Sequence, residues 1–156
     1  MADQHPQPIF RVAAPADVHQ LVELRILQLL DEGYAEITDI RRELSQYFST
    51  NLQNGSLVCW VGVVEEIIFA TAGICFYQLP PTFSNPSGQI AYITNMYTDP
   101  HYRGQGTASL LLSKLLSEAK ARNYSSVRLH ASRLGRGVYE KAGFVDTDGY
   151  MAMKFE

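Results

Sequence analysis

The sequence predicts a single α/β domain over residues 1–156, and three observations lead to this fold class. Segments with helical spacing of apolar residues alternate with short runs rich in Val, Ile and aromatic residues. A chain of 156 residues with 46% hydrophobic residues is long enough to bury one core. Neither an internal repeat nor a flexible linker divides it, so one domain is expected.

The N-terminal part is expected to form a strand and two helices. The run PIFRVAA at 8–14 is typical of a short strand, and apolar residues recur at helical spacing over 17–30. A second helix is predicted to begin after Thr38, an N-cap candidate, and to end near Leu52. The residues NLQNGS at 51–56 indicate a turn.

A β-hairpin and a further strand are predicted next. The runs LVCWVGVVE at 57–65 and IIFATAGICFY at 67–77 are nearly apolar on both faces, which is typical of adjacent buried strands. Three prolines keep 78–88 in a loop, and the strand QIAYITNMYT follows at 89–98.

A long helix, a strand, a short helix and a last strand complete the prediction. Leucines and alanine form one apolar stripe of a helix over 104–122. The run SVRLHA at 126–131 is typical of a strand, and a short helix is expected around 137–142. The run YMAMKFE at 150–156 is predicted to close the chain as a strand.

Composition excludes several classes of protein. No run approaches the roughly 18 apolar residues of a membrane span, and the N-terminus lacks the basic flank and apolar run of a secretory signal. We therefore expect no membrane partner and a cytoplasmic location. Cys59 and Cys75 lie in apolar runs, which favours two reduced thiols over a disulfide. Histidines and cysteines show no ligand spacing, so no metal is expected.

The net charge of −3 conceals an uneven distribution of charged residues. Residues 101–141 carry eight Lys and Arg against two acidic residues, whereas residues 1–100 carry four basic and eleven acidic ones. Ordinary surface scatter gives such a pattern, and so does a protein with one segment that receives an anion and another that receives a cation. The basic residues are dispersed along a leucine-rich helix, so no nucleic-acid partner is expected.

The stretch YRGQGTASLLL at 102–112 places two glycines at the start of the predicted long helix. Each glycine costs a helix about 1 kcal/mol relative to alanine. A strand, a glycine-rich turn and a helix N-terminus together bind phosphate, because first-turn N–H groups lack intrahelical partners and glycine lets an anion reach them. Close packing or a tight turn is the alternative explanation.

Two familiar phosphate-binding motifs do not fit this stretch. A P-loop requires Lys and then Ser or Thr after its last glycine, but Thr107 and Ala108 follow Gly106. A dinucleotide fingerprint requires a third glycine where Ser109 stands, and an acid at the end of the next strand, which ends in His-Ala-Ser. The remaining pattern is R-x-x-G-x-A, which begins at Arg103.

This pattern resembles the hallmark Q/R-x-x-G-x-G/A of the GNAT superfamily of acetyl-coenzyme A-dependent N-acetyltransferases. The stretch NMYTDPHYRGQGTASLLL at 95–112 is similar to the family's strand–bulge–loop–helix unit, and VYEKAGF at 138–144 is similar to its tyrosine-bearing helix. The order of elements also agrees. The resemblance implies an α/β fold with a mixed, mostly antiparallel central sheet of about six to seven strands, about four flanking helices, and splayed fourth and fifth strands.

The resemblance also implies acetyl-coenzyme A as co-substrate, bound by two segments. Backbone amides of the glycine motif would cradle the pyrophosphate, and exposed main chain of the fourth strand would pair with pantetheine. An amide in this gap would also polarise the thioester carbonyl. The residues are Arg103, Gly104, Gln105, Gly106, Thr107 and Ala108 in the motif, and Met96, Tyr97 and Thr98 in the strand.

Tyr139 matches the family tyrosine that protonates the departing thiolate. A phenol with a reference pKa near 10 can transfer a proton to a thiolate of pKa near 8.5, although the transfer is mildly uphill. A packed aromatic on a short helix is the alternative explanation. One departure concerns Ser132, which lies in the segment where the family often places an asparagine.

The general base is the larger departure. Many members use Glu or His on the fourth strand, whereas this strand offers only Tyr92, Thr94 and Asn95. His130 on the neighbouring strand is of the residue type that titrates near neutral pH, but a lone strand histidine is more often structural. We expect deprotonation through water, relayed to a distant carboxylate, and we assign no base.

The resemblance places the acceptor between the first two helices, the fourth strand and the neighbouring loops. Acidic residues beside aromatic ones would suit a cationic amine, through charge attraction and cation–π contact, although a solvated helix end also explains the acids. Polyamine, aminoglycoside, amino acid and protein N-terminus all stay open. The expected acceptor residues are Glu32, Tyr34, Tyr77 and Tyr92, with Asp31 and Glu36 nearby.

The resulting interpretation is an N-acetyltransferase that moves an acetyl group from acetyl-coenzyme A to a primary amine of a small molecule or peptide. The amine attacks directly in a ternary complex, with Tyr139 as general acid. The alternative is a non-catalytic acyl-coenzyme A sensor, which the missing base and asparagine favour. A homodimer is expected by analogy only, because family members are often dimers.

Overall fold

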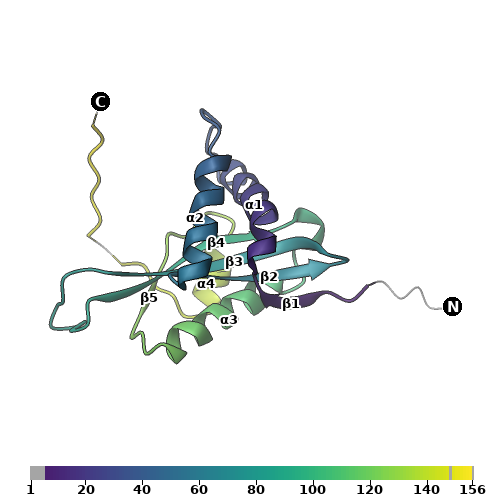
Figure 1. Cartoon of the computed structure of the whole chain (residues 1–156). Coiled ribbons are helices and arrows are strands. Elements are labelled where there is room, and N and C mark those ends of the chain that lie inside the picture. Colours follow the sequence, from purple (N-terminus) through teal and green to yellow (C-terminus); the bar gives the residue numbers. More distant parts are fainter. Residues whose placement is uncertain (1–5, 148, 156) are drawn as a thin grey trace.

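A central β-sheet separates two layers of helices in the computed structural model, which describes residues 6–147 and 149–155 (Figure 1). The sheet has five strands in the order β1-β2-β3-β4-β5, of which the first four are antiparallel and β5 is parallel to β4. The strands are β1 (Ile9–Val12), β2 (Leu57–Val64), β3 (Ile67–Gln78), β4 (Gln89–Thr98) and β5 (Val127–Arg128). The helices are α1 (Val18–Asp31) and α2 (Arg41–Asn54) on one face, α3 (Thr107–Ala121) on the other, and the short α4 (Arg136–Lys141). Short 3-10 turns, η1 (Pro15–Asp17) and η2 (Pro100–Tyr102), precede α1 and α3.

Each face of the sheet has its own buried core. Leu21 and Phe48 bury the facing sides of α1 and α2 against one face, and Leu111 and Leu115 bury α3 against the other. Successive strand residues point to opposite faces, so a strand between two helical layers must be apolar on both. This confirms the predicted hairpin and the α/β class. Among the helices that the structure describes, none is long and apolar enough to cross a membrane.

The sheet contains fewer strands than the predicted six to seven. The strand predicted at 126–131 shrinks to Val127–Arg128, which pairs only with Ala91 and Tyr92 of β4. Beyond this point the two strands separate, so the remaining residues have no ladder to join. Short pairing at the start of β4 is the splayed geometry that the resemblance implied.

The strand predicted at 150–156 is also wrong for the residues that are described. Residues 149–155 form no strand and extend away from the sheet (Figure 1). Met151 and Phe155 are 98% and 90% exposed, so this segment lacks the neighbouring edge that a strand needs for its backbone hydrogen bonds. Residue 156 lies outside the described part of the chain.

The ends of α2 differ from the prediction at both sides. The N-cap is Ile40 instead of Thr38, and the Asp39 carboxylate accepts the Arg41 N–H at 3.0 Å. The helix continues through most of the predicted turn and stops at Gly55, whose φ of +78° supplies a left-handed C-cap.

Both cysteines are free thiols, in agreement with the prediction. Burial raises the pKa of the Cys59 thiol to about 12, so it stays protonated at neutral pH. Cys75 is only partly buried, and burial raises its pKa as well.

A bulge in β4 sets the geometry of the site. Two residues of β4, Asn95 and Met96, lie opposite the single residue Ala72 of β3, and Asn95 takes a left-handed φ of +56°. The neighbouring position 73 leaves little room for a side chain, because a Cβ on Gly73 would lie 3.2 Å from the Thr94 carbonyl oxygen. The bulge lies past the last residue that pairs with β5, where one edge of β4 is free.

Candidate functional site

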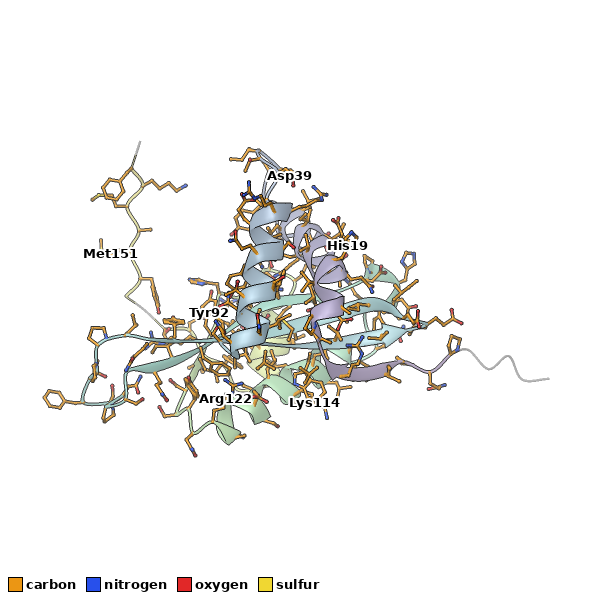
Figure 2. The ribbon with its side chains drawn as sticks, in the orientation of Figure 1. His19, Asp39, Tyr92, Lys114, Arg122 and Met151 are labelled. Atoms are coloured by element: carbon orange, nitrogen blue, oxygen red, sulfur yellow. The ribbon has the colours of Figure 1, made fainter. Side chains whose placement is uncertain are left out.

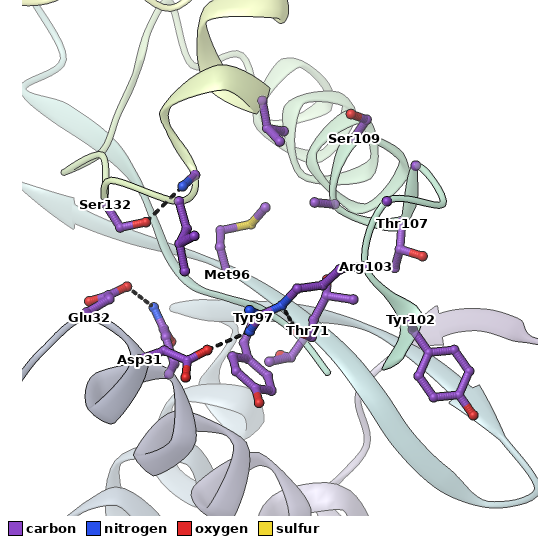
Figure 3. Close-up of a pocket in the computed structure, with 18 of the residues that line it drawn as sticks. Asp31, Glu32, Thr71, Met96, Tyr97, Tyr102, Arg103, Thr107, Ser109 and Ser132 are labelled. Atoms are coloured by element: carbon purple, nitrogen blue, oxygen red, sulfur yellow. Dashed lines mark hydrogen bonds and ion pairs between the residues drawn. The ribbon is translucent and has the colours of Figure 1, made fainter. Parts of the chain in front are cut away.

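A cleft of about 440 Å³ opens between the end of α1, the second half of β4, the N-terminus of α3 and the start of α4 (Figure 3). It brings the two predicted cofactor segments together. The predicted residues that line it are Met96, Tyr97, Thr98, Arg103, Gly104, Gly106, Thr107 and Ala108. Gln105 belongs to the same turn but does not line the cleft.

The glycine motif presents an open row of backbone donors to this cleft. Gly104 and Gly106 have φ values of +74° and +80°, and a Cβ on either would meet nothing within 4 Å. Within the described part of the chain, the N–H groups of residues 104–109 have no hydrogen-bond partner, and no side chain caps α3. Left-handed residues before a helix N-terminus form an anion-binding nest, and the helix dipole adds to its attraction. The turn can therefore bind a phosphate or pyrophosphate.

Arg103 connects this turn to the end of α1. Its Nη2 donates to the Asp31 carboxylate at 2.5 Å, and its Nε donates to the Thr98 carbonyl at 2.8 Å. The guanidinium carbon also lies 5.6 Å from the centroid of the Tyr97 ring. Partly exposed ion pairs contribute only about 0–1 kcal/mol, so Arg103 can exchange Asp31 for an anionic ligand at little cost. Burial, and then the charge of Asp31, raises the pKa of Tyr97, which stays neutral.

The wall of the cleft near the bulge contains a residue that the sequence analysis missed. Thr71 of β3 lines the cleft and is 1% exposed, and its hydroxyl has no hydrogen-bond partner among the described residues. The Nδ2 of Asn95 in the bulge is also buried and without a partner there. Unsatisfied buried groups cost about 1–3 kcal/mol each. The signal in the sequence that could have identified Thr71 was its position as a single hydroxyl residue inside an apolar strand run.

Tyr139 lies behind the wall of the cleft. It is 6% exposed and packs against Gly135, where an added Cβ would meet the Tyr139 ring at 2.9 Å. Ser132, at the position where the family often has an asparagine, accepts the Gly135 N–H at 3.1 Å and thereby holds the start of α4. Gly135 and Ser132 line the cleft, so Tyr139 sits directly beneath its surface.

The chemistry available to Tyr139 follows from its burial. Burial first, and then the charges of Glu32 and Tyr92, raises the pKa of Tyr139 to about 12. The phenol therefore keeps its proton at neutral pH and can donate it. Full transfer to a thiolate of pKa near 8.5 would be uphill by about 3 to 4 pKa units, or about 5 kcal/mol. A ligand in the cleft must therefore stabilise the phenolate, or receive a hydrogen bond instead of a complete proton.

Tyr139 also lines a second cavity, of about 650 Å³, bounded by β5, α4 and the residues that follow α4. Tyr92 of β4 and His130 line it too, and the Tyr92 hydroxyl is hydrogen-bonded to Nδ1 of His130. Tyr139 thus lies between the cleft and this cavity, because it packs on Gly135 on one side and faces the cavity on the other.

The predicted acceptor residues are divided among three places. Glu32 lines the cleft, and its carboxylate accepts a hydrogen bond from Gln28 at 3.0 Å. Tyr92 lines the second cavity, whereas Tyr34 and Tyr77 line neither and are 63% and 42% exposed. The residues that the structure describes include no group of three or more His, Cys, Asp or Glu side chains that could hold a metal ion.

The fold and the cleft define a class of protein. It is an α/β domain with a cleft between a free strand edge and a bare helix N-terminus, a geometry suited to a phosphate-bearing ligand. The model of the acetyltransferase (GNAT) family matches residues 21–144, which is most of the chain. The chain therefore belongs to the GNAT family of acetyltransferases.

Individual relatives agree with this assignment. A crystal structure of a predicted acetyltransferase with acetyl-CoA from Clostridium acetobutylicum has 44% sequence identity and a TM-score of 0.92, over 95% of this chain and 96% of that chain. Human N-acetyltransferase 8B is 29% identical over 120 residues, which are 73% of this chain and 49% of that protein. The uncharacterized N-acetyltransferase YhfO of Bacillus subtilis (strain 168) is 34% identical over 82 residues, which are 50% of this chain and 55% of that protein. The chain thus spans about half the length of the curated relatives it matches.

Proposed function

We propose that this chain transfers an acetyl group from acetyl-coenzyme A to a primary amine by direct attack in a ternary complex. The observation that carries the proposal is the open row of N–H donors at 104–109, facing a cleft that also contains the free edge of β4. The 44% identical relative from Clostridium acetobutylicum, whose structure was solved with acetyl-CoA, supports this choice of co-substrate.

The residues of the cleft fit the two ends of this co-substrate. The amides at 104–109 would hold the pyrophosphate, and Arg103 would supply a positive charge beside it. The main chain of Met96, Tyr97 and Thr98 is not paired with β5 and would bond pantetheine as an added strand does. Bound acetyl-coenzyme A supplies an activated thioester, and the bulge at Asn95 keeps the edge open for it.

Tyr139 is the proposed general acid. It lies beneath Gly135 and Ser132, at the end of the cleft remote from the glycine motif, and it is fully protonated at neutral pH. Its raised pKa suits a donor that gives up its proton only as negative charge develops on sulfur. Gly135 allows the close approach of the ring.

The proposed acceptor is a cationic amine. Asp31 and Glu32 end α1 on the rim of the cleft, and the N-terminal 100 residues carry the acidic excess of the chain. A carboxylate beside the reacting centre would attract an ammonium group and fix its orientation. Amines on small molecules and on peptides both meet this requirement.

The test is a two-stage measurement on the purified chain. Calorimetry with acetyl-coenzyme A should show binding, and a panel of polyamines, aminoglycosides, amino acids and peptides should include at least one amine that releases free thiol. Mass spectrometry then identifies the acetylated nitrogen. Binding without thiol release from any amine would favour the acyl-coenzyme A sensor, and absence of binding would contradict both functions.

A further inference from the structure

A pair of side chains joins β4 to the residues after β5 and faces the second cavity. The Tyr92 hydroxyl contacts Nδ1 of His130, and the ring centroids lie 5.7 Å apart at 59°. Figure 2 shows Tyr92 at the end of the sheet where β4 and β5 pair. The contact bridges 38 positions of sequence, immediately before the two strands separate.

A proton relay requires the Tyr92 hydroxyl to be the donor in this hydrogen bond. Burial raises the pKa of Tyr92, so its hydroxyl is neutral and carries the proton at physiological pH. A neutral phenol can donate or accept here, and when it donates to Nδ1 of His130, that ring is the tautomer with its proton on Nε2. The lone pairs of the Tyr92 oxygen stay free to accept a proton from another group. This is the arrangement of a two-step proton acceptor.

The charged side chains around the pair, among the residues that the structure describes, are cations and carboxylates that are already paired. Arg25 of α1 and Arg128 of β5 are the nearby cations, and Arg136 of α4 is paired with Glu140 at 3.1 Å and Asp146 at 2.9 Å. Among the described residues, these two acids are the carboxylates that line this cavity, and Arg136 engages both.

Further titratable side chains surround the pair. They are Cys75 and Tyr77 of β3, Tyr139 of α4 and Tyr150 of the C-terminal segment, whose ring centroid lies 5.9 Å from that of His130. Arg128 donates to the Tyr150 hydroxyl at 3.1 Å. Tyr139 therefore shares one cavity with the Tyr92–His130 pair, which places the proposed acid and a proton acceptor around the same space.

We infer that Tyr92 and His130 form the relay that takes the proton from the acceptor ammonium, and this inference rests on the proposed function. In this scheme the Tyr92 oxygen takes the proton from the substrate nitrogen, so Tyr92 is the catalytic residue of the pair, and His130 is a positioning residue that receives the proton through it. The inference replaces the expected distant carboxylate with a phenol–imidazole pair.

The protons and bonds balance in this scheme. The ammonium gives one proton to the Tyr92 oxygen, while the Tyr92 proton passes to Nδ1 of His130. The neutral nitrogen bonds to the thioester carbonyl carbon, the carbon–sulfur bond breaks with its electron pair on sulfur, and Tyr139 protonates the sulfur. The second proton lost by the nitrogen restores Tyr139, and His130 releases its proton to water. No group is oxidised or reduced.

The decisive experiment compares Tyr92→Phe, His130→Gln and the double variant with His19→Gln, using the amine that the screen identifies. His19 is an exposed histidine of α1 on a different part of the molecule (Figure 2), so it is a matched control. At pH 7 each single variant should lose at least about 30-fold in kcat/KM, since general-base catalysis is worth about 10²–10⁴-fold. Because the two residues act as one unit, the double variant should lose no more than the worse single variant.

Two further readouts separate a relay from a purely structural contact. The loss should shrink toward onefold as the pH approaches about 10, where the acceptor amine is deprotonated by solvent, and affinity for acetyl-coenzyme A should stay unchanged. Nitrogen NMR of the unmutated chain should show Nδ1 of His130 without a proton. The NMR readout requires no variant to fold.

The outcomes distinguish the relay from the proposed function. Thiol release by the unmutated chain, with Tyr92→Phe and His130→Gln within twofold of His19→Gln, would overturn the relay and leave the transferase standing. A proton on Nδ1 of His130 in the resting protein would also overturn it. If the unmutated chain releases no thiol with any amine in the panel, the proposed function fails first and the relay fails with it.

Discussion

The two cavities that meet at Tyr139 are built from different parts of the polypeptide. The cleft presents backbone N–H groups at 104–109 and the free edge of β4. The second cavity presents side chains instead, with the Tyr92–His130 pair and Tyr139 on its lining. A backbone site is set by local turn geometry, whereas a side-chain site depends on strands that meet only after folding. Mutations should therefore act on the two cavities by different routes.

The largest expected effect comes from filling the backbone site. Gly104→Val combined with Gly106→Val places side chains in the open space before the amides and should lower acetyl-coenzyme A affinity at least about 100-fold, since several charge-assisted hydrogen bonds are lost. Calorimetry measures this change. Gly55→Val is the matched control, because Gly55 has a similar φ of +78° and equally open space but lies outside the cleft. Equal losses in both variants would show that backbone strain alone is responsible.

Removal of the Tyr139 hydroxyl tests the proposed general-acid role of the residue that lies between the two cavities. Tyr139→Phe should lower kcat about 10- to 100-fold and leave acetyl-coenzyme A affinity unchanged, because a general acid acts after binding. Steady-state kinetics and calorimetry together measure this split. Tyr124→Phe, which alters a tyrosine that packs against Phe76 in a tilted arrangement outside both cavities, serves as control. An unchanged kcat would assign Tyr139 to packing.

Alkaline pH should weaken the fold through the same tyrosine. The pKa of Tyr139 is raised from an ordinary value of 10 to about 12 in the folded chain, so its stabilising effect is complete below pH 10 and is lost between pH 10 and 12. The Tyr139 share of the unfolding free energy should fall by about 1.4 kcal/mol from pH 9 to pH 11. Denaturant titrations of the unmutated chain and Tyr139→Phe measure it by difference. Parallel pH curves would mean that the phenol is not buried in solution.

The smallest expected effect concerns the ion pair on the rim of the cleft. Asp31→Asn removes the partner of Arg103, and because both groups are partly exposed the unfolding free energy should change by less than about 1 kcal/mol. Affinity for acetyl-coenzyme A should rise slightly, since Arg103 would no longer have to break its ion pair with Asp31 before it contacts the pyrophosphate. Glu23→Gln, which removes a partner of the exposed Arg41, is the control. A large loss of affinity would assign Asp31 to the binding site itself.

The contrast between the cavities also explains what could be predicted from the sequence. The glycine motif and the strand before it are local features, and the residues that the resemblance assigned there line one cleft, apart from Gln105. Helix and strand positions followed from periodicity over most of the chain. The closing strand was predicted from residue type alone, but whether residues 149–155 pair depends on an available edge, which local sequence does not encode.

Contacts between distant strands were beyond prediction for the same reason. Tyr92 and His130 were each recognised as single residues, yet their hydrogen bond depends on the parallel pairing of β4 with β5. Thr71 was missed because a hydroxyl in an apolar run normally satisfies itself within the strand. Its place opposite Tyr97, directly after the bulge on the neighbouring strand, is revealed only by the register.

The extra residue at the Asn95 bulge interrupts the alternation of side chains along β4. The two halves of the strand can therefore face their neighbours independently. In a regular strand Tyr92 and Tyr97, five positions apart, would point to opposite sides, but the insertion returns both to the side covered by α1 and α2. Deleting one residue there would turn the second half of the strand over, so that Met96 and Tyr97 would exchange the two cores that they face. One added residue thus lets the two halves of a continuous strand present their side chains to different neighbours.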